Sequence, residues 1–330
     1  MNAISQLSRR AVLAAASLLL ALGASAQAYP GGPLTLMVPY PAGGASDVIA
    51  RIFNTPMARD LGVPVLVENL GGVSGALGAQ KVLSAPANGQ SFFQGSPNEL
   101  ILAPLANAAV KFEAEDFQLV QLIAQTPMVV VARKDLPAAS MDELVTLARQ
   151  APRDKPLNYG SVGTGSLYHV LSEHLGQVIG AKMTHVPYKG AAPLLQDLAG
   201  GNVDYAILPH FGAIDGMVAA GRVKLLGQLG AQRAETLKQL PTATEGKLLK
   251  DFAYMTWTGY LVRKGTAAEV VQRLQKAIQA TLSDSKVRES LTAQSQLVAR
   301  PMSLEESARF YATETAGYRK LARAVGIERQ

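Results

Sequence analysis

The stretch from Leu34 to Phe53 constrains the fold more than any other part of the chain. Leu34–Val38 reads as a short buried strand, and Val48–Phe53 carries apolar residues at helical spacing. Between them lies Tyr40-Pro41-Ala42-Gly43-Gly44-Ala45-Ser46-Asp47, with two adjacent glycines and a Ser-Asp pair suited to cap a helix. A strand, a Gly-rich turn and a helix start place unpaired N–H groups at the positive end of a helix dipole, which predicts an anion site.

The same plan recurs in the second half of the chain. Tyr159-Gly160-Ser161-Val162-Gly163-Thr164-Gly165-Ser166 follows a predicted strand and precedes a predicted helix that runs through Ile179. Two such turns in separate halves predict a two-lobed receptor in which both helix N-termini face a cleft. An anion held there gains charge-assisted backbone hydrogen bonds from both sides, and the lobes close over it.

Strand and helix patterns alternate along most of the chain, which predicts an α/β fold with two parallel-rich sheets flanked by helices. Predicted strands cover residues 34–38, 65–67, 91–94, 119–123, 128–132, 157–160, 184–186, 205–208, 224–229 and 252–262. Predicted helices cover residues 47–61, 76–84, 141–150, 191–199, 212–220, 267–282 and 285–293, the helix ending at 179, and a last helix capped by Ser303. Pro56 is expected to kink or interrupt the first helix.

Residues 1–28 have the pattern of a secretory signal peptide. Arg9 and Arg10 precede an uncharged apolar run over 11–24, and Ala26-Gln27-Ala28 matches a small-x-small cleavage pattern. The run is too short for a typical membrane span, although an N-terminal anchor is the alternative. The paired arginines fit either the Sec or the twin-arginine route. We therefore expect an exported, periplasmic protein cleaved near Ala28.

The remaining chain is long enough for two domains. Two extended crossings join the α/β halves, as in the hinged solute receptors of bacteria. We predict domain 1 from residues 29–130 plus 255–330, and an inserted domain 2 from residues 131–254. The 330 residues contain no cysteine, so an exported protein of this sequence depends on its core instead of disulfides.

The composition limits the kinds of partner that this protein is expected to bind. The formal net charge is +6, and removal of residues 1–28 takes away two arginines and no acid. No Lys/Arg run and no basic stretch with interleaved aromatic residues is present, which argues against nucleic acid. A mildly positive field suits a small anionic ligand.

Motifs of enzymes and cofactor sites are incomplete. Gly72-Val73-Ser74-Gly75-Ala76 lacks the spacing of a hydrolase elbow, and neither Gly-rich turn continues into Gly-Lys-Ser/Thr. Gly163-Thr164-Gly165 opens a dinucleotide motif, but Tyr168 stands where the third glycine belongs. The four histidines have no metal-ligand spacing. We expect no catalytic residue, no cofactor and no metal.

Polar residues in the two turns each have two open roles. Asp47 either caps its helix or positions the ligand or a water molecule. Ser46, Thr164 and Ser166 either cap helices or touch the ligand. His169, one turn into the second helix, either packs and caps or faces the ligand.

Aromatic residues near the predicted crossings are open in the same way. Phe211 either lines the cleft or lies in a domain core. Trp257 and Tyr254 are expected to pack in the core or at the hinge.

The order of several motifs resembles a known family. They are Tyr29-Pro30, the Val38–Asp47 stretch with Ala50-Arg51, Val67-Glu68-Asn69, the Tyr159–Ser166 stretch with His169, His185-Val186-Pro187-Tyr188-Lys189-Gly190, Gly200-Gly201-Asn202-Val203-Asp204, Ala220-Gly221-Arg222-Val223-Lys224 and Leu240-Pro241-Thr242-Ala243-Thr244-Glu245. Together they resemble the Bug family of extracytoplasmic solute receptors, the periplasmic component of tripartite tricarboxylate transporters. The resemblance covers nearly all of the chain after residue 28.

The resemblance implies a type II-like two-lobed binding fold, a small carboxylate ligand and the membrane permease subunits as partners. The two loops would pinch a carboxylate, and residues near Ser96-Pro97-Asn98 and Leu208–Phe211 would select the rest of the molecule. The predicted ligand-binding residues are Tyr40, Ala42, Gly43, Gly44, Ser46, Asp47, Ser96, Asn98, Ser161, Val162, Gly163, Thr164, Gly165, Ser166, His169 and Phe211. A monomer is expected. A sensor kinase as partner, in a signalling role, and an enzyme on the same fold are the alternatives.

Some motifs depart from the family. Its members usually carry Asp-Gly-Tyr-Thr where Asn88-Gly89-Gln90-Ser91 stands, and Gly-Ala-Gly-Gly where Gly72-Val73-Ser74-Gly75 stands. Pro56 within the first helix is also unusual. These departures leave the identity of the carboxylate open.

Overall fold

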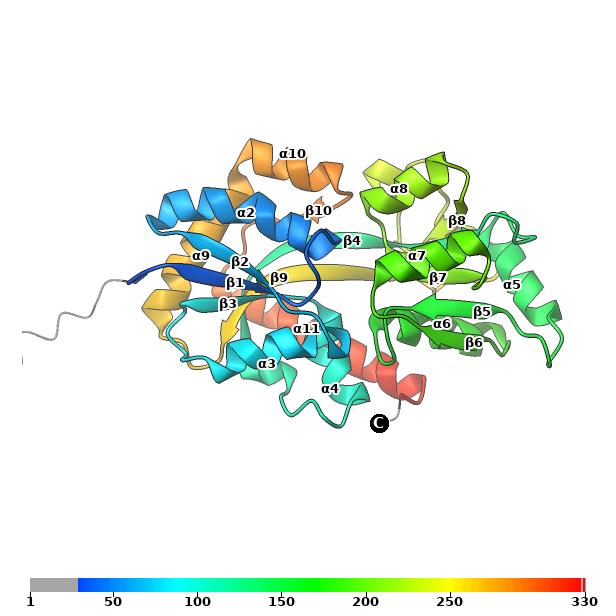
Figure 1. Ribbon diagram of the computed structural model, residues 1–330, viewed down its shortest axis with the longest axis horizontal. Helices are drawn as coiled ribbons and strands as arrows, with labels where there is room; N and C mark the ends of the chain where they lie inside the picture. Colours follow the sequence, from blue (N-terminus) through cyan, green and yellow to red (C-terminus); the bar gives the residue numbers. More distant parts are fainter. Residues whose placement is uncertain (1–28, 328, 330) are drawn as a thin grey trace, which may run out of the picture.

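The computed structural model describes residues 29–327 and residue 329, so the predicted signal peptide lies outside the described residues. The chain alternates strands and helices and forms two groups of elements that lie side by side (Figure 1). No helix in the described ranges is both long and apolar enough to cross a membrane.

Three parallel strands begin the first group. They are β1 (Leu34–Val38), β2 (Val65–Asn69) and β3 (Ser91–Gly95). β1 lies between the other two, with Leu34 opposite Val65 and Thr35 opposite Ser91. Because parallel strands end at the same edge of a sheet, the turns that follow β1 and β3 emerge on the same side of this group.

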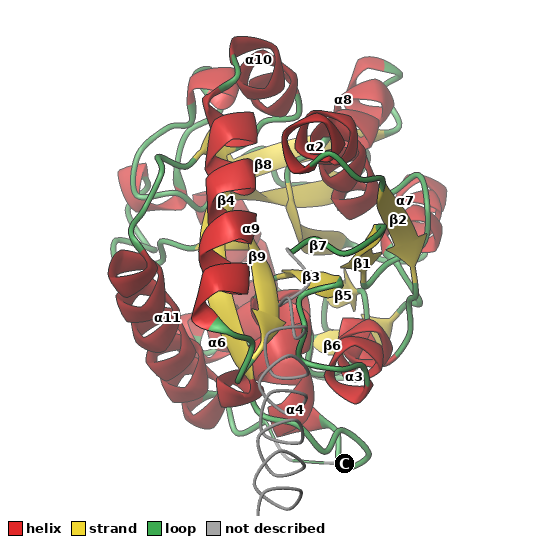
Figure 2. Ribbon diagram, turned by 90° about the vertical axis from the view of Figure 1, so that its left-hand side faces the viewer, coloured by secondary structure: helices red, strands yellow, loops and turns green. Residues whose placement is uncertain are grey.

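Helices cover both faces of these strands because side chains alternate along β1. Leu34, Leu36 and Val38 pack in one buried cluster with α2 (Ala45–Leu61), α9 (Ala268–Ser283) and α10 (Ser285–Ala293). Met37 points to the other cluster, which holds α3 (Ala76–Ser84) and α11 (Leu304–Ala324). Figure 2 shows α2 and α10 on one side of the strands and α3 and α4 (Ala103–Ala106) on the other.

Two long antiparallel strands connect the groups. β4 (Phe117–Arg133) pairs with β9 (Met255–Arg263) from Phe117 to Pro127, and with β7 and β8 from Met128 onward. The prediction of two separate strands at 119–123 and 128–132 is therefore wrong. Residues 125–127 remain paired with β9, and this pairing carries the strand through Pro127.

The second group repeats the parallel plan. Its strands are β5 (Asn158–Ser161), β6 (Thr184–Pro187), β7 (Tyr205–Pro209) and β8 (Val223–Gln228). β5 lies between β6 and β7 and runs parallel to both. Its helices are α5 (Met141–Gln150), α6 (Leu167–Ile179), α7 (Ala191–Gly200) and α8 (Gly212–Ala219).

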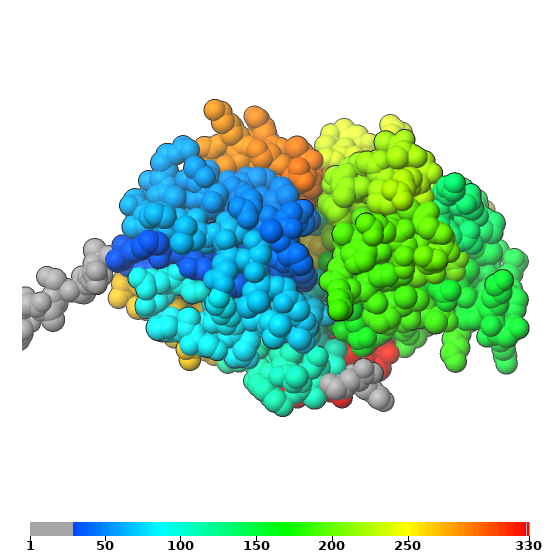
Figure 3. Space-filling view, viewed as in Figure 1, coloured from blue at the N-terminus to red at the C-terminus, as the bar shows by residue number. Residues whose placement is uncertain are grey.

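The strands follow the order β2-β1-β3-β9-β4-β7-β5-β6. Figure 3 shows the two groups, which we call the first and second lobes, as two bodies with a furrow between them. One buried cluster nevertheless continues from Phe93 in the first lobe to Tyr159 in the second. The lobes are thus joined by core as well as by strands, and the exact domain limits at 130 and 254 stay a prediction.

The chain after β9 returns to the first lobe. β10 (Leu297–Val298) pairs with β4, with Leu297 opposite Gln125. α11 begins with a capping box in which Ser303 accepts from the backbone of Glu306, and it contacts β4 in the first lobe and α6 in the second.

Short helical turns complete the described chain. They are η1 (Val73–Gly75), η2 (Asn98–Leu102), η3 (Ala114–Asp116), η4 (Glu235–Leu237) and η5 (Ala243–Glu245). η2 is a turn of π-helix, a rare form that occurs mostly at functional sites.

Pro56 does not interrupt the first helix, contrary to the sequence prediction. α2 continues from Ala45 to Leu61 because Phe53 and Met57, on either side of Pro56, are fully buried and hold the helix on the core. That packing outweighs the loss of one backbone hydrogen bond, the cost that a proline imposes inside a helix.

Candidate functional site

The first loop, residues 40–47, follows β1 and leads into α2. Ala42, Gly43 and Gly44 are exposed, so the loop presents backbone at the surface. Gly43 has a φ of 82°, a left-handed conformation that glycine adopts without strain. Its N–H donates to a carboxylate oxygen of Asp47 at 2.9 Å, which holds the turn together.

The structure corrects how α2 is capped. Gly44 is the N-cap, without a side-chain cap, and Ser46 lies inside the helix as its second residue. Asp47 caps the loop instead of the helix end, because it accepts from the Gly43 backbone and from Arg51 Nε, each at 2.9 Å. Burial acts to raise the pKa of Asp47, but the hydrogen bond and charge of Arg51, with hydrogen bonds from the Gly43 backbone and Asn69, outweigh burial and lower the pKa. Its charge is therefore paired with Arg51, one turn further along α2.

The second loop, residues 161–166, follows β5 and leads into α6. Ser166 is the N-cap of α6 and accepts from the His169 backbone at 3.3 Å, so its capping role is confirmed. The Gly165 N–H donates to His169 Nδ1 at 3.0 Å, and the Gly163 N–H to Ser161 Oγ at 3.2 Å. Most polar side chains of this loop thus hold the loop's own backbone, while Thr164 is exposed.

His169 and His185 stack beneath this loop. Their ring centroids lie 4.1 Å apart, and Tyr159 stacks on His185 at 5.1 Å. His185 Nε2 lies 2.7 Å from Ser161 Oγ. Burial lowers the pKa of both imidazoles, that of His185 to about 4. At neutral pH both rings are uncharged, so they position the loop without adding positive charge.

Asn98 connects the two lobes. It lies in η2 of the first lobe, and its Oδ1 accepts from the Leu167 N–H, at the start of α6 in the second lobe, at 2.6 Å. Its Nδ2 donates to the Tyr168 hydroxyl at 3.2 Å. Asn98 is only 2% exposed, and both ends of its amide are used in these two hydrogen bonds. The sequence predicted a ligand contact at Asn98, and the structure gives it a role between the lobes.

Glu99, the next residue, was not singled out from the sequence. It is 0% exposed and accepts from the Tyr40 hydroxyl and Ser96 Oγ, each at 2.9 Å, and from the Ser96 backbone. Burial raises the pKa of Glu99 to about 7, although these hydrogen bonds act in the opposite direction. The sequence did hold a signal for Glu99, which is a single carboxyl group directly before the apolar run 100–106. Because acids are rarely buried without partners, an acid in such a run is a candidate for a special role.

Two glycines of the second loop approach the first lobe closely. A Cβ on Gly165 would lie 2.0 Å from Ala106 Cβ, and a Cβ on Gly163 would lie 3.2 Å from Ser74 Oγ. The second loop is therefore seated on α4 and η1 in this structure, with no room for a side chain at position 165.

The turn η1 carries local backbone strain. Val73 and Ser74 have φ values of 51° and 52°, which are unfavourable for residues with a Cβ and most of all for a β-branched one. Ser74 stands where the resembled family usually has glycine, and its hydroxyl faces the second loop.

A second link between the lobes lies at the start of α8. His210 is 2% exposed, and its Nδ1 lies 2.7 Å from Ser295 Oγ, in the segment that leads to β10. Phe211 is the N-cap of α8 and packs, partly buried, against the main core cluster. Trp257 is 1% exposed and Tyr254 packs against the same core, as predicted.

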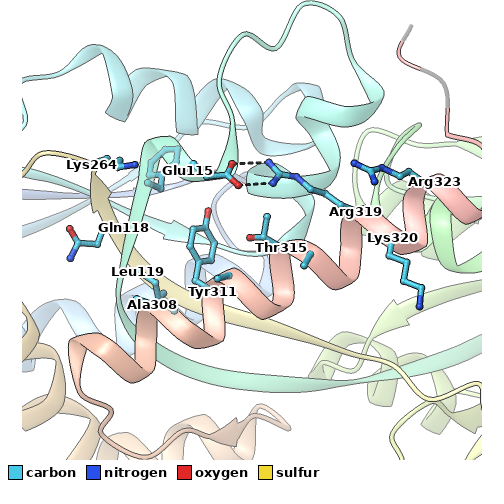
Figure 4. A pocket seen from close by; sticks show the side chains of 13 residues that line it. Glu115, Gln118, Leu119, Lys264, Ala308, Tyr311, Thr315, Arg319, Lys320 and Arg323 are labelled. Carbon is cyan, nitrogen blue, oxygen red and sulfur yellow. Dashed lines mark hydrogen bonds and ion pairs between the residues drawn. The ribbon is translucent and has the colours of Figure 1, made fainter.

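A surface groove of about 600 Å³ lies away from both loops, between α11 and the start of β4, and Figure 4 shows that Glu115 and Arg319 face each other there. The pair is bidentate, with contacts of 2.6 and 2.7 Å. The groove shares no residue with the two loops.

Comparison with known proteins identifies the family. The model of the tripartite tricarboxylate transporter family receptors, TctC, matches residues 49–327. The chain belongs to this family. A relative from Agrobacterium vitis, the UPF0065 protein in the TAR-I ttuE-ttuC' intergenic region, is 35% identical over 289 residues, covering 87% of this chain and 82% of the relative. BugT of Bordetella pertussis is 27% identical and covered at 92% of each chain.

Solved structures of similar proteins agree along almost the whole chain. R. palustris Rpa4515 with adipate has a TM-score of 0.84 and 30% identity, over 92% of this chain and 100% of that one. MatC (Rpa3494) from Rhodopseudomonas palustris, with bound malate, has a TM-score of 0.80 and 28% identity, over 89% and 99%. The predicted family and the two-lobed binding-protein fold are confirmed.

Proposed function

We propose that this chain is a periplasmic receptor that captures a small organic carboxylate between its lobes and delivers it to a tripartite tricarboxylate-type transporter. The observation that carries the proposal is the pair of Gly-rich loops, one per lobe, that lead into α2 and α6. Ala42, Gly43 and Gly44 are exposed in the first loop, and Thr164 is exposed in the second. Helix N-termini favour anions. The likeness to proteins that hold adipate and malate supports a carboxylate as the anion.

Within this proposal the residues divide into two roles. The backbone of Ala42 and Gly44 in the first loop, and of Val162 and Thr164 in the second, contacts the carboxylate. Phe211 packs against the core at the start of α8. The other predicted residues hold these loops in shape: Tyr40, Gly43, Ser46, Asp47, Ser96, Asn98, Ser161, Gly163, Gly165, Ser166 and His169.

The proposed receptor has no catalytic step. Ser161 and His185 are within hydrogen-bond distance, as in a hydrolase, but Ser161 is 0% exposed and also contacts the Gly163 backbone. Ser295 beside His210 is 5% exposed. A nucleophile must reach its substrate, so neither pair supports a hydrolase.

Isothermal titration tests the proposal. The protein without residues 1–28 is unfolded and refolded to remove bound ligand, and is then titrated with adipate, malate, an aromatic carboxylate and a neutral sugar. We expect binding of at least one carboxylate and none of the sugar. Binding of the sugar alone would contradict the proposal.

The transport role needs a separate measurement. In a strain that lacks the gene, uptake of the radiolabelled carboxylate found by titration should return with the wild-type chain. Tight binding without restored uptake would favour the alternative in which the receptor docks on a sensor kinase.

A further inference from the structure

Two adjacent residues of η2 connect the two candidate ligand loops. Glu99 accepts from the hydroxyl of Tyr40, which begins the first loop, and Asn98 accepts from the Leu167 N–H, directly after the second loop. Tyr168 lies beside both Asn98 and Glu99. Glu99 thus contacts the first loop directly, and its neighbour Asn98, in the same π-helical turn, contacts the residue that follows the second loop.

We propose that Glu99 is a positioning residue whose ionisation sets the carboxylate affinity: the neutral form supports binding and the ionised form weakens it. The inference rests on the proposed function, because it concerns the anion site formed by the two loops. Glu99 touches no ligand in this proposal and acts through Tyr40 and Asn98.

The hydrogen bonds of Glu99 differ between its two forms. The ionised carboxylate accepts all three hydrogen bonds, from the Tyr40 hydroxyl, Ser96 Oγ and the Ser96 N–H. The neutral acid has a proton of its own, which it donates to one of the two hydroxyl oxygens. Where Tyr40 accepts this proton, its own hydroxyl proton is free for another acceptor. Ionisation thus reorients Tyr40 and adds a buried negative charge near an anion site.

The groups around Glu99 carry no positive charge that would compensate. The hydroxyls of Tyr40, from the first loop, and Ser96 donate to it, and Tyr168 from α6 and Tyr311 from α11 lie near enough for its charge to affect their pKa values. The burial that raises the pKa of Glu99 to about 7 also raises the pKa of all three phenols, so they stay neutral. Only Glu99 in this cluster changes charge near neutral pH.

Burial lowers the pKa of His169, and that of His185 to about 4. The carboxylates of adipate, with ordinary pKa values of about 4 to 5, are ionised above pH 6. The part of the change in affinity between pH 6 and 8.5 that disappears in Glu99→Gln therefore reports Glu99.

The test is titration with adipate, or malate if adipate does not bind, from pH 6 to 8.5. For the wild type we expect affinity to fall about tenfold over this range, which is one pKa unit of coupling. Glu99→Gln, which mimics the neutral acid, should bind with wild-type affinity at pH 6 and keep it at pH 8.5. Tyr40→Phe removes a hydrogen bond that lowers the pKa of Glu99, so the midpoint should move to higher pH.

Glu314→Gln is the matched control. Burial also raises the pKa of Glu314, which lies on α11 beside Trp257, outside the hydrogen-bonded cluster. This variant should keep the wild-type pH dependence. The inference fails if Glu99→Gln keeps the wild-type slope, if the wild type shows no slope, or if folded Glu99→Gln loses binding at every pH. Failure of all carboxylates to bind the wild type would overturn the proposed function itself.

Discussion

Ser74 has a strained backbone at a position where the resembled family usually carries glycine. Its φ of 52° costs a residue with a Cβ about 1 kcal/mol, and glycine avoids that cost. We expect Ser74→Gly to raise the free energy of unfolding by about 0.5–1 kcal/mol in denaturant melts. Ser84→Gly, at the end of α3, should lower it by a similar amount, since there the serine is helical. Equal destabilisation by both changes would contradict the strain at position 74.

Glu99 makes the stability of the protein depend on pH in a defined direction. Its pKa rises from 4.5 in ordinary surroundings to about 7 in the fold, so the native state binds a proton more tightly than the unfolded state. Stability from this group is fully present below pH 4.5 and is lost as pH rises towards 7. Because one pKa unit is worth about 1.4 kcal/mol, the loss is on the order of 3 kcal/mol.

Glu99→Gln should remove this dependence. We expect the variant to match the wild type at pH 5 within about 1 kcal/mol and to exceed its free energy of unfolding by about 2–3 kcal/mol at pH 8. Chemical denaturation at the two pH values measures the difference. A wild-type advantage at pH 8 would mean that the ionised carboxylate is stabilised by its hydrogen bonds and that burial does not dominate.

At the scale of elements, the second loop fits closely on α4, and a substitution in this loop can test whether that contact between the lobes matters for binding. Gly165→Ala places a Cβ 2.0 Å from Ala106 Cβ, whereas Gly180→Ala meets nothing within 4 Å. The φ values of 75° and 64° make the backbone strain of the two changes similar, about 1 kcal/mol. We expect Gly165→Ala to weaken adipate binding at least tenfold and Gly180→Ala to change it less than twofold, as measured by titration. Equal effects of the two changes on adipate affinity would mean that backbone strain alone causes both.

The sequence predicted most elements because their signals are local. α5, α10 and β1 have the predicted bounds, since alternation, capping residues and helical spacing are local properties. The sequence predicted two strands in place of β4, because the middle of β4 is held by pairing with β9, more than a hundred residues along the chain. Such long-range pairing leaves no local pattern.

The difference between local and long-range signals also explains which residues of the site the sequence predicted. The glycines of both loops stand out in the sequence because turns require them. Asn98 and Glu99 owe their roles to partners at Leu167 and Tyr40, which lie 69 and 59 positions away, and only the folded chain brings them together.

At the scale of the whole molecule, directed hydrogen bonds join the lobes in addition to the shared core. Asn98 reaches α6 from one side, and His210 of the second lobe reaches Ser295 of the first-lobe tail. β4 is paired in both lobes, with β9 in the first and with β7 and β8 in the second, and such a continuous strand can bend as a hinge. The balance between open and closed lobes then depends on contacts of a few kcal/mol, which is within the reach of one ligand.

Asn98→Ala tests this balance. Truncation leaves the Leu167 N–H without its acceptor when the lobes are closed, at a cost of about 1–3 kcal/mol. The closed state becomes less populated, so adipate affinity should fall about 5- to 150-fold. The radius of gyration without ligand, from small-angle X-ray scattering, should exceed that of the wild type and return to it at saturating adipate. Asn202→Ala removes an exposed asparagine of the second lobe, which bonds Asp197 within that lobe, and should change neither quantity. If Asn98→Ala binds adipate like the wild type, the Asn98 contact does not hold the lobes together, and closure depends on the ligand alone.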